Sequence, residues 1–116
     1  MQITLCRAKI HRARVTDANL DYEGSITIDS GLMDLAGILP YEKVHVVNVN
    51  NGTRVETYVI PGKRNSGEIC LNGPAARMGQ VNDLVVVMAY GLFSVEEARH
   101  FTPRIVTVDA DNRPVS

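Results

Sequence analysis

Short runs of valine, isoleucine and other apolar residues recur along the chain, and Gly, Pro, Asn or Asp separates each run from the next. Such runs are typical of the strands of small β-barrels and β-sandwiches. Strands are predicted at residues 2–10, 25–29, 41–48, 53–60, 68–71, 84–89 and 105–108. The pattern therefore predicts a mostly-β fold, with a tail after Asp109 that frays.

Three short helical turns are predicted to interrupt the strands. They are residues 31–36 between Ser30 and Gly37, residues 74–78 before Gly79, and a Ser-Val-Glu-Glu capping box that opens at Ser94.

The sharpest local signal is the Asn51-Gly52 pair between two predicted strands, because this pair suits the positive φ angles of a tight hairpin turn. Alternation along the strand that follows places Arg54 and Tyr58 on one face and Thr57 on the other. A cation and a phenol therefore share a face. Alternation in the first strand likewise predicts a basic side made of Arg7, Lys9 and His11.

Length and composition narrow the class of protein. The 116 residues suffice for one compact domain, and 45% hydrophobic with 22% charged residues is a globular balance. A net charge of −1 makes neither nucleic acid nor an anionic membrane the expected partner. The longest apolar stretch, residues 84–93, is half a membrane span. Cys6 and Cys70 form neither a disulfide framework nor a metal-binding motif, which favours a reducing, cytoplasmic location.

Taken singly, the candidate residues are weak signals. His45 and His100 lack partners at metal-ligand spacing and are interpreted as packing or surface residues. Asn72-Gly73-Pro74 is interpreted as a turn that starts a helix, with backbone N–H groups able to hold a carboxylate. Gly24-Ser25 by itself indicates only a loop. The residues alone thus predict a small β domain with one possible anion-binding face.

Five short motifs follow one another in order: Lys9-x-His11, Tyr22-Glu23-Gly24-Ser25, Ala36-Gly37-Ile38-Leu39, Asn51-Gly52-x-Arg54-x-x-Thr57-Tyr58 and Asn72-Gly73-x-Ala75-Ala76. Together they resemble the pyruvoyl-dependent aspartate 1-decarboxylase family over about residues 9–87. The resemblance implies a six-stranded double-psi β-barrel with short helical turns, and a homotetramer with active sites between subunits. It also implies decarboxylation of L-aspartate to β-alanine and CO2 for pantothenate and coenzyme A.

The same resemblance implies that the chain cuts itself between Gly24 and Ser25, giving a short chain of residues 1–24 and a longer one of residues 25–116. Ser25 would become a pyruvoyl group, so that neither a metal nor pyridoxal phosphate is expected. The resemblance gives Thr57 the role of stabilising the oxyanion during cleavage, with Asn72 and Tyr22 in support. Whether a separate protein accelerates cleavage stays open.

In the mature enzyme the resemblance implies a Schiff base between the pyruvoyl group and the amine of aspartate, with Tyr58 as the proton donor to Cα. The substrate-binding residues that it implies are Lys9, His11, Arg54, Thr57, Asn72, Gly73, Pro74 and Ala75. Pro74 departs from the small residue usual in the family and removes one backbone N–H from the expected carboxylate cradle. Two alternatives are a β-barrel module that binds small anions without maturing, and a decarboxylase for another amino acid such as glutamate.

Overall fold

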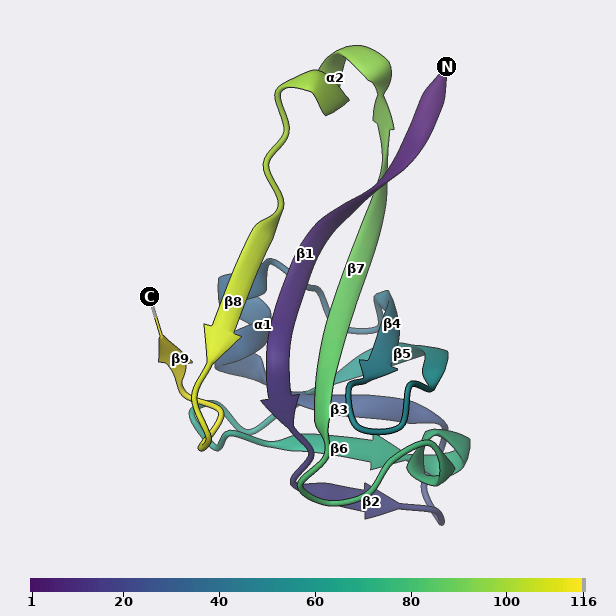
Figure 1. Ribbon diagram of the computed structural model, residues 1–116, viewed down its shortest axis with the longest axis vertical. Helices are drawn as coiled ribbons and strands as arrows, with labels where there is room; N and C mark the ends of the chain where they lie inside the picture. The colour runs from purple at the N-terminus through teal and green to yellow at the C-terminus, as the bar shows by residue number, and fades with distance from the viewer. Residues whose placement is uncertain (116) are drawn as a thin grey trace.

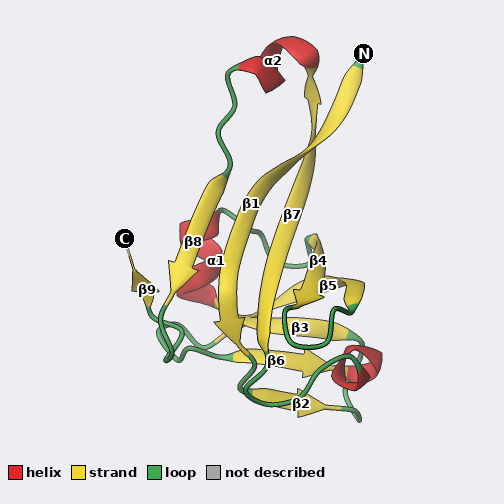
Figure 2. Ribbon diagram, in the orientation of Figure 1, coloured by secondary structure: helices red, strands yellow, loops and turns green. Residues whose placement is uncertain are grey.

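The computed structural model describes residues 1–115 and is mostly β, as predicted. The strands are β1 (Gln2–Arg14), β2 (Asp17–Asn19), β3 (Ser25–Asp29), β4 (Lys43–Asn48), β5 (Arg54–Gly62), β6 (Ile69–Asn72), β7 (Leu84–Ser94), β8 (Arg104–Val108) and β9 (Pro114–Val115). The helices are α1 (Ser30–Ala36), the 3-10 helix η1 (Gly73–Arg77) and α2 (Val95–Arg99). Figure 2 shows how little of the chain is helical.

All nine strands belong to one mixed sheet in the order β2-β6-β3-β5-β4-β7-β1-β8-β9. The long antiparallel pair of β1 and β7 forms a ribbon that extends from the body of the molecule, with α2 at its far end (Figure 1). The strands β2, β3 and β6 lie across the foot of this ribbon. The sheet therefore turns sharply between its two halves, through the pairing of β5 with both β3 and β4.

One hydrophobic core fills the inner face of the curled sheet. Alternate residues of the strands form this core, such as Ile26 and Ile28 of β3 and Val44 and Val46 of β4, all of which are buried. Inward-facing residues of β1, β5, β6, β7 and β8 complete the same cluster. Polar side chains such as Thr27 of β3 and His45 of β4 lie on the opposite face of these strands.

The end of β1 returns to the opposite half of the sheet. The Thr16 N–H donates to the backbone carbonyl of Ile69 at 2.8 Å, and the Val15 N–H donates to the backbone carbonyl of Asp83 at 2.9 Å. These bonds curl the sheet without adding a strand ladder between β1 and β6. Closure as a six-stranded double-psi barrel stays a prediction.

A register shift in β1 changes the predicted basic side of this strand. The register with β7 shifts between Cys6 and Ala8, and Arg7 at this shift forms an ion pair with Glu42 and donates to the Gly37 carbonyl at 3.0 Å. Arg7 is thus committed to the segment before β4. Lys9 and His11 do share the outer face, because the residue between them is fully buried.

The Asn51-Gly52 signal correctly predicts the β4–β5 hairpin, but the predicted tight turn is wrong. The pairing nearest to the turn joins Val47 to Arg54, and the Gly52 N–H donates to the Asn48 carbonyl at 2.9 Å. Gly52 adopts a positive φ of 75°, but Asn51 does not. The loop is therefore longer than a two-residue turn.

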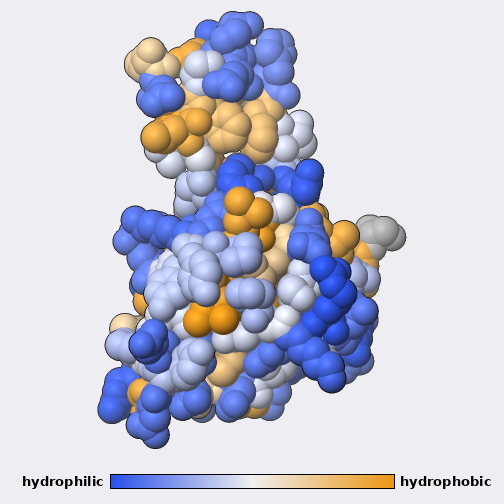
Figure 3. Space-filling view, turned by 180° about the vertical axis from the view of Figure 1, so that it is seen from behind, coloured by the Kyte–Doolittle hydropathy of each residue, from blue (hydrophilic) through white to orange (hydrophobic). Residues whose placement is uncertain are grey.

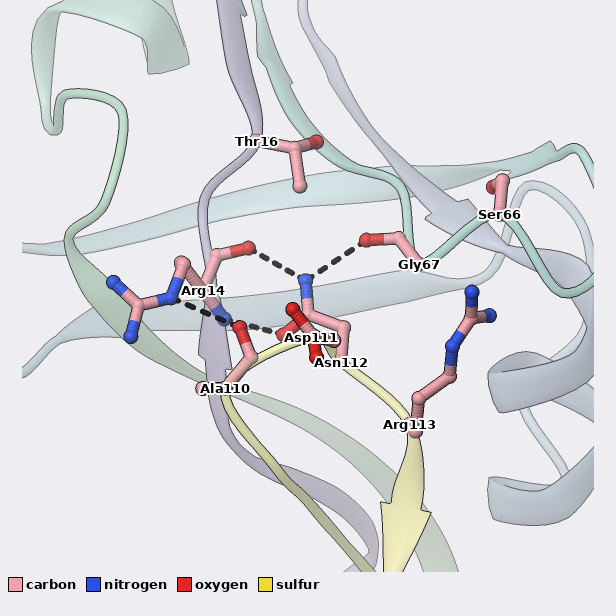
Figure 4. A pocket seen from close by; sticks show the side chains of 8 residues that line it. All are labelled: Arg14, Thr16, Ser66, Gly67, Ala110, Asp111, Asn112 and Arg113. Carbon is pink, nitrogen blue, oxygen red and sulfur yellow. Dashed lines mark hydrogen bonds between the residues drawn. The ribbon is translucent and has the colours of Figure 1, made fainter.

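The prediction that the chain frays after Asp109 is also wrong for the residues that the structure describes. Asn112 is buried, and its side-chain amide donates to the carbonyls of Arg14 and Gly67, both at 2.8 Å. Its Oδ1 accepts from the Arg14 N–H at 2.7 Å. Figure 4 shows these bonds joining the end of β1 to the turn before β9, at the floor of a pocket of about 370 Å³.

The helical turns form where they are predicted, with one change of cap. The capping box at Ser94 is complete, since its Oγ accepts from the Glu97 N–H at 3.1 Å and the Glu97 carboxylate accepts from the Ser94 N–H at 2.8 Å. The cap of α1 is Asp29 in place of the predicted Ser30. None of α1, η1 and α2, the helices within residues 1–115, has the length and hydropathy of a bilayer-spanning helix.

Candidate active site

Ser25 is the first residue of β3 and is fully buried at the edge of the core. β3 lies between β6 and β5, so Ser25 pairs with Asn72 on one side. On the other side the parallel ladder begins one residue later, where Ile26 pairs with Val59. The peptide that precedes Ser25 is therefore at the point where the chain enters the sheet.

A chain of hydrogen bonds surrounds the Ser25 hydroxyl. Ser25 Oγ donates to the Glu23 carbonyl at 3.2 Å and accepts from Asn72 Nδ2 at 3.0 Å. Asn72 Nδ2 also donates to Thr27 Oγ1 at 2.9 Å, and Asn72 Oδ1 accepts from the Cys70 thiol at 3.1 Å. Register explains the cluster, because Ser25 and Thr27 alternate with buried isoleucines on β3 and face Asn72 and Cys70 on β6.

The turn before Ser25 packs tightly against the start of η1. Gly73 has a positive φ of 61°, and a Cβ at this position would lie 2.7 Å from the Tyr22 carbonyl oxygen and 2.8 Å from Gly24 N. Only glycine fits both the backbone angle and this contact. The ring of Pro74 also packs here, 3.4 Å from the place of a Gly24 Cβ. Residues 22–25 and 72–74, distant in sequence, thus form one compact unit.

Tyr58 and Thr57 lie on opposite faces of β5. In the antiparallel ladder Tyr58 pairs with the exposed Lys43, whereas Thr57 pairs with the fully buried Val44. Continuing the parallel ladder back by one residue from the Ile26–Val59 pair places Tyr58 opposite Ser25, on the same face of the sheet. No register shift interrupts β5 in either ladder.

Arg54 shares the outer face of β5 with Tyr58, as the alternation predicts. Its guanidinium donates to His45 Nδ1 at 3.0 Å, and His45 Nε2 lies 3.2 Å from Glu56 Oε1. Because arginine only donates, Nδ1 must accept and Nε2 must carry the hydrogen that faces Glu56. The Tyr90 ring packs edge-on against His45 with centroids 5.0 Å apart. The chain Glu56–His45–Arg54 restrains the guanidinium, and its middle member His45 lines an open cavity of about 410 Å³.

Lys9 and His11 lie on β1, several strands from Ser25 in the order of the sheet. Four strand steps separate β3 from β1 in the sheet order, which is on the order of 19 Å along the surface. Both side chains face outward beside β8, where Lys9 pairs with Ile105 and His11 with Thr107. The strand order therefore places the predicted site residues of one chain in two groups, one on β1 and one on β3, β5 and the β6–η1 segment.

The remaining predicted residues belong to the Ser25 group. Ala75 is buried in η1, directly after Gly73 and Pro74, and the side chain of Tyr22 is half exposed. The role of the Gly73–Ala75 backbone as a carboxylate cradle stays a prediction, and Pro74 contributes no N–H to it. Residues 1–115 contain no group of three or more His, Cys, Asp or Glu side chains placed to hold a metal ion.

Sequence analysis missed three side chains of these networks: Thr27, Cys70 and His45. The first two had a signal, since Thr27 stands two residues after Ser25 and Cys70 stands two residues before Asn72 in predicted strands. His45 had none, because its contact with Arg54 depends on the register of the hairpin. Burial, together with Asp17 and Glu68, raises the pKa of the Cys70 thiol to about 11, so this thiol keeps its proton at neutral pH.

Comparison with known proteins gives a consistent result over the whole chain. The family model described as aspartate decarboxylase matches residues 1–115. An aspartate 1-decarboxylase of Thermoanaerobacter pseudethanolicus is 54% identical over 100% of this chain and 99% of the relative. The enzyme of Desulfitobacterium hafniense is 59% identical over 97% of this chain and 88% of the relative. That of Acetivibrio thermocellus is 57% identical over 100% of this chain and 92% of the relative. The chain belongs to the aspartate decarboxylase family.

Proposed function

We propose that this protein is a lyase that removes the α-carboxylate of L-aspartate, giving β-alanine and CO2, with a pyruvoyl group made from its own Ser25. The relatives named aspartate 1-decarboxylase support the reaction. The observation that carries the proposed role of Ser25 is its buried hydroxyl, held by Asn72 beside the Gly24 turn. β-Alanine produced in this way would enter pantothenate synthesis.

Maturation begins with the Ser25 hydroxyl. Its Oγ forms a bond to the Gly24 carbonyl carbon, the Gly24 C–Ser25 N bond breaks, and the hydroxyl proton moves to the released nitrogen. Loss of Cα–H and cleavage of Cβ–Oγ then release residues 1–24 with a C-terminal carboxylate and leave dehydroalanine at position 25. Addition of water and departure of ammonia convert the dehydroalanine to the ketone.

Thr57 is the proposed hydroxyl donor to the oxygen of the Gly24 carbonyl during the first step. Extending the β3–β5 register back by two residues brings the Gly24 peptide beside Thr57. Because the Thr57 hydroxyl would meet the backbone of Gly24 and not a side chain on one face of the sheet, Thr57 and Tyr58 need not share a face. The close packing of Gly73 against the N and Cα of Gly24 also restrains the residue whose carbonyl is attacked.

The surroundings of position 25 fit a pyruvoyl group. A ketone only accepts hydrogen bonds, and Asn72 Nδ2 is an N–H donor beside position 25. The ketone oxygen itself would stand on Cα, in place of the Ser25 nitrogen. When present, the group supplies an electrophilic carbonyl that binds the substrate amine and draws electrons from Cα as CO2 leaves.

The other side chains bind aspartate and manage the proton. Arg54 presents a planar fork that suits a carboxylate, and its contact with His45 limits the motion of that fork. Tyr58 lies on the Ser25 face with a phenolic proton for the substrate Cα. Lys9 and His11 add positive charge for a substrate with two carboxylates.

A homotetramer with sites between subunits is part of the proposal. Lys9 and His11 lie on a strand four steps from β3 in the sheet order, and we assign their place beside the Ser25 group to a neighbouring chain. Large apolar side chains exposed in the single chain, such as Leu92 at 68% and Ile105 at 57%, would be covered by such contacts. Figure 3 shows apolar groups below the polar end of the β1–β7 ribbon.

A reducing cytoplasm completes the proposal, because both cysteines are free thiols. The activity test compares L-aspartate with L-glutamate and measures CO2 and β-alanine. We expect turnover of aspartate only, because one extra methylene misplaces the distal carboxylate. Ser25→Ala should abolish turnover, whereas the exposed loop variant Ser66→Ala should not. Anion binding without turnover would favour the non-maturing module.

Mixing of variants tests the shared site. Ser25→Ala and Lys9→Ala chains are each expected to be inactive or nearly so. Co-assembled at equal amounts, they should regain roughly a quarter of the sites, because random pairing reunites an intact Ser25 with an intact Lys9 at that frequency. Failure of every mixture to regain activity would contradict a site formed between chains.

A further inference from the structure

We propose that Cys70 is a positioning residue for self-cleavage: its thiol fixes the Asn72 amide with the nitrogen toward Ser25. The inference rests on the proposed maturation at Gly24-Ser25 and goes beyond it, because Cys70 touches neither the bond that breaks nor the substrate. Cys70 lies on β6, 6% exposed, two residues before Asn72.

The hydrogen-bond inventory of Asn72 is complete only in one orientation. Both hydrogens of Nδ2 have acceptors, Ser25 Oγ at 3.0 Å and Thr27 Oγ1 at 2.9 Å. Oδ1 then needs a donor, and the Cys70 thiol supplies it at 3.1 Å. The amide, the thiol and the serine hydroxyl are all buried, so water does not replace a missing partner cheaply.

Rotation of the amide by 180° would exchange these contacts. Oδ1 would then face the Ser25 and Thr27 hydroxyls, and Nδ2 would face sulfur, which is a weak acceptor. A protonated thiol therefore favours the observed orientation. The raised pKa of Cys70 is consistent with this role, because burial first, and then Asp17 and Glu68, keep the thiol protonated and able to donate.

The orientation matters for the first step of cleavage. As Oγ attacks the Gly24 carbonyl carbon, its proton passes to the Ser25 nitrogen, and the Gly24 C–Ser25 N bond breaks. An N–H from Asn72 stabilises negative charge on Oγ as the proton leaves, and it also restricts the Ser25 rotamer. A flipped amide would instead accept the Ser25 proton in a hydrogen bond and hold the hydroxyl away from attack.

The experiment follows cleavage of freshly synthesised full-length chains by denaturing intact-mass analysis over time. Cys70→Ala and Cys70→Val remove the donor, and the valine keeps most of the apolar volume. Cys70→Ser restores a donor. Cys6→Ala is the matched control, because Cys6 is a half-buried thiol that donates to the Ala8 carbonyl outside this network.

We expect cleavage about tenfold slower in Cys70→Ala and Cys70→Val, which corresponds to 1.36 kcal/mol in the barrier. Cys70→Ser should cleave at a rate near that of the wild type, and Cys6→Ala should be unchanged. Melting temperatures recorded in a Ser25→Ala background separate loss of stability from loss of rate.

Two outcomes would overturn the inference: wild-type cleavage rates in both apolar variants, or a Cys70→Ser rate as slow as that of Cys70→Val. A failure of the proposed maturation looks different, since the wild-type chain itself would then remain intact. If Cys70→Ala does not fold, Cys70→Val and Cys70→Ser still give the comparison.

Discussion

Gly73 offers a direct perturbation of the turn that carries Gly24 and Ser25. In Gly73→Ala the new Cβ would lie within 2.9 Å of three backbone atoms, the Tyr22 oxygen and the Gly24 N and Cα, at a φ of 61°. The left-handed conformation costs about 1–2 kcal/mol in a residue with a Cβ. Displacing packed backbone costs a further 1–3 kcal/mol or so. We therefore expect Gly73→Ala to lower the free energy of unfolding by about 2–5 kcal/mol. Self-cleavage should also be slow, because the new methyl group displaces Gly24.

Gly52→Ala is the matched control, because Gly52 has a φ of 75° and no atom within 4 Å of its Cβ position. Gly52→Ala should lose only the cost of the left-handed backbone, about 1–2 kcal/mol of the free energy of unfolding, and should cleave normally. Thermal melts at one protein concentration, in a Ser25→Ala background, compare the two, at about 4 °C per kcal/mol. Equal melting temperatures, with normal cleavage in Gly73→Ala, would refute the close packing of the Gly24 turn.

Three further predictions concern other parts of the chain. Asp29→Ala removes the acceptor for the Gly31, Asn65 and Gly67 N–H groups and should destabilise by about 2 kcal/mol at neutral pH. Burial by itself would raise the pKa of Asp29, but these hydrogen bonds lower it below the ordinary value of 3.8. The stabilisation is therefore complete above pH 3.8 and is lost as the pH falls through the folded-state pKa. Urea unfolding should show the wild-type advantage shrinking in acid, and a constant advantage would contradict this. Asn112→Ala should lower the free energy of unfolding by about 3 kcal/mol, because three side-chain hydrogen bonds are lost. Asn112→Gly should lose about 1 kcal/mol less, because glycine adopts the φ of 58° without strain. Equal losses of the two variants in denaturant unfolding would count against a strained turn. Arg54→Lys keeps the charge but loses the fork, so KM for aspartate should rise at least about tenfold in steady-state assays, and an unchanged KM would remove Arg54 from substrate binding.

The strands with alternating apolar residues could be predicted from the sequence. β3 has the predicted bounds, and β4, β5, β6 and β8 are displaced by one or two residues at one or both ends. The short strands β2 and β9 were missed, because two or three residues carry no periodicity and their pairing depends on distant partners. β1 extends four residues beyond its prediction, because Arg12 takes a positive φ of 61° that keeps the later residues paired with β7.

The sequence also predicts which candidate residues share a strand face, because alternation is a local property. It correctly separates Thr57 from Tyr58 and unites Arg54 with Tyr58. It does not predict that Arg7 turns to Glu42, since a bulge and an ion pair across 35 residues decide that contact. Nor does it predict how many strands lie between Lys9 and Ser25, because the strand order of the whole sheet decides that.

The central claim is that Ser25 becomes a pyruvoyl group by cleavage of this chain. Denaturing intact-mass analysis of the purified protein, with and without hydrazine to trap a ketone, tests it most directly. The account predicts two fragments, residues 1–24 and 25–116, with the mass shift from hydrazine confined to the larger one. A single intact chain that does not react with hydrazine and yet decarboxylates aspartate would contradict the account.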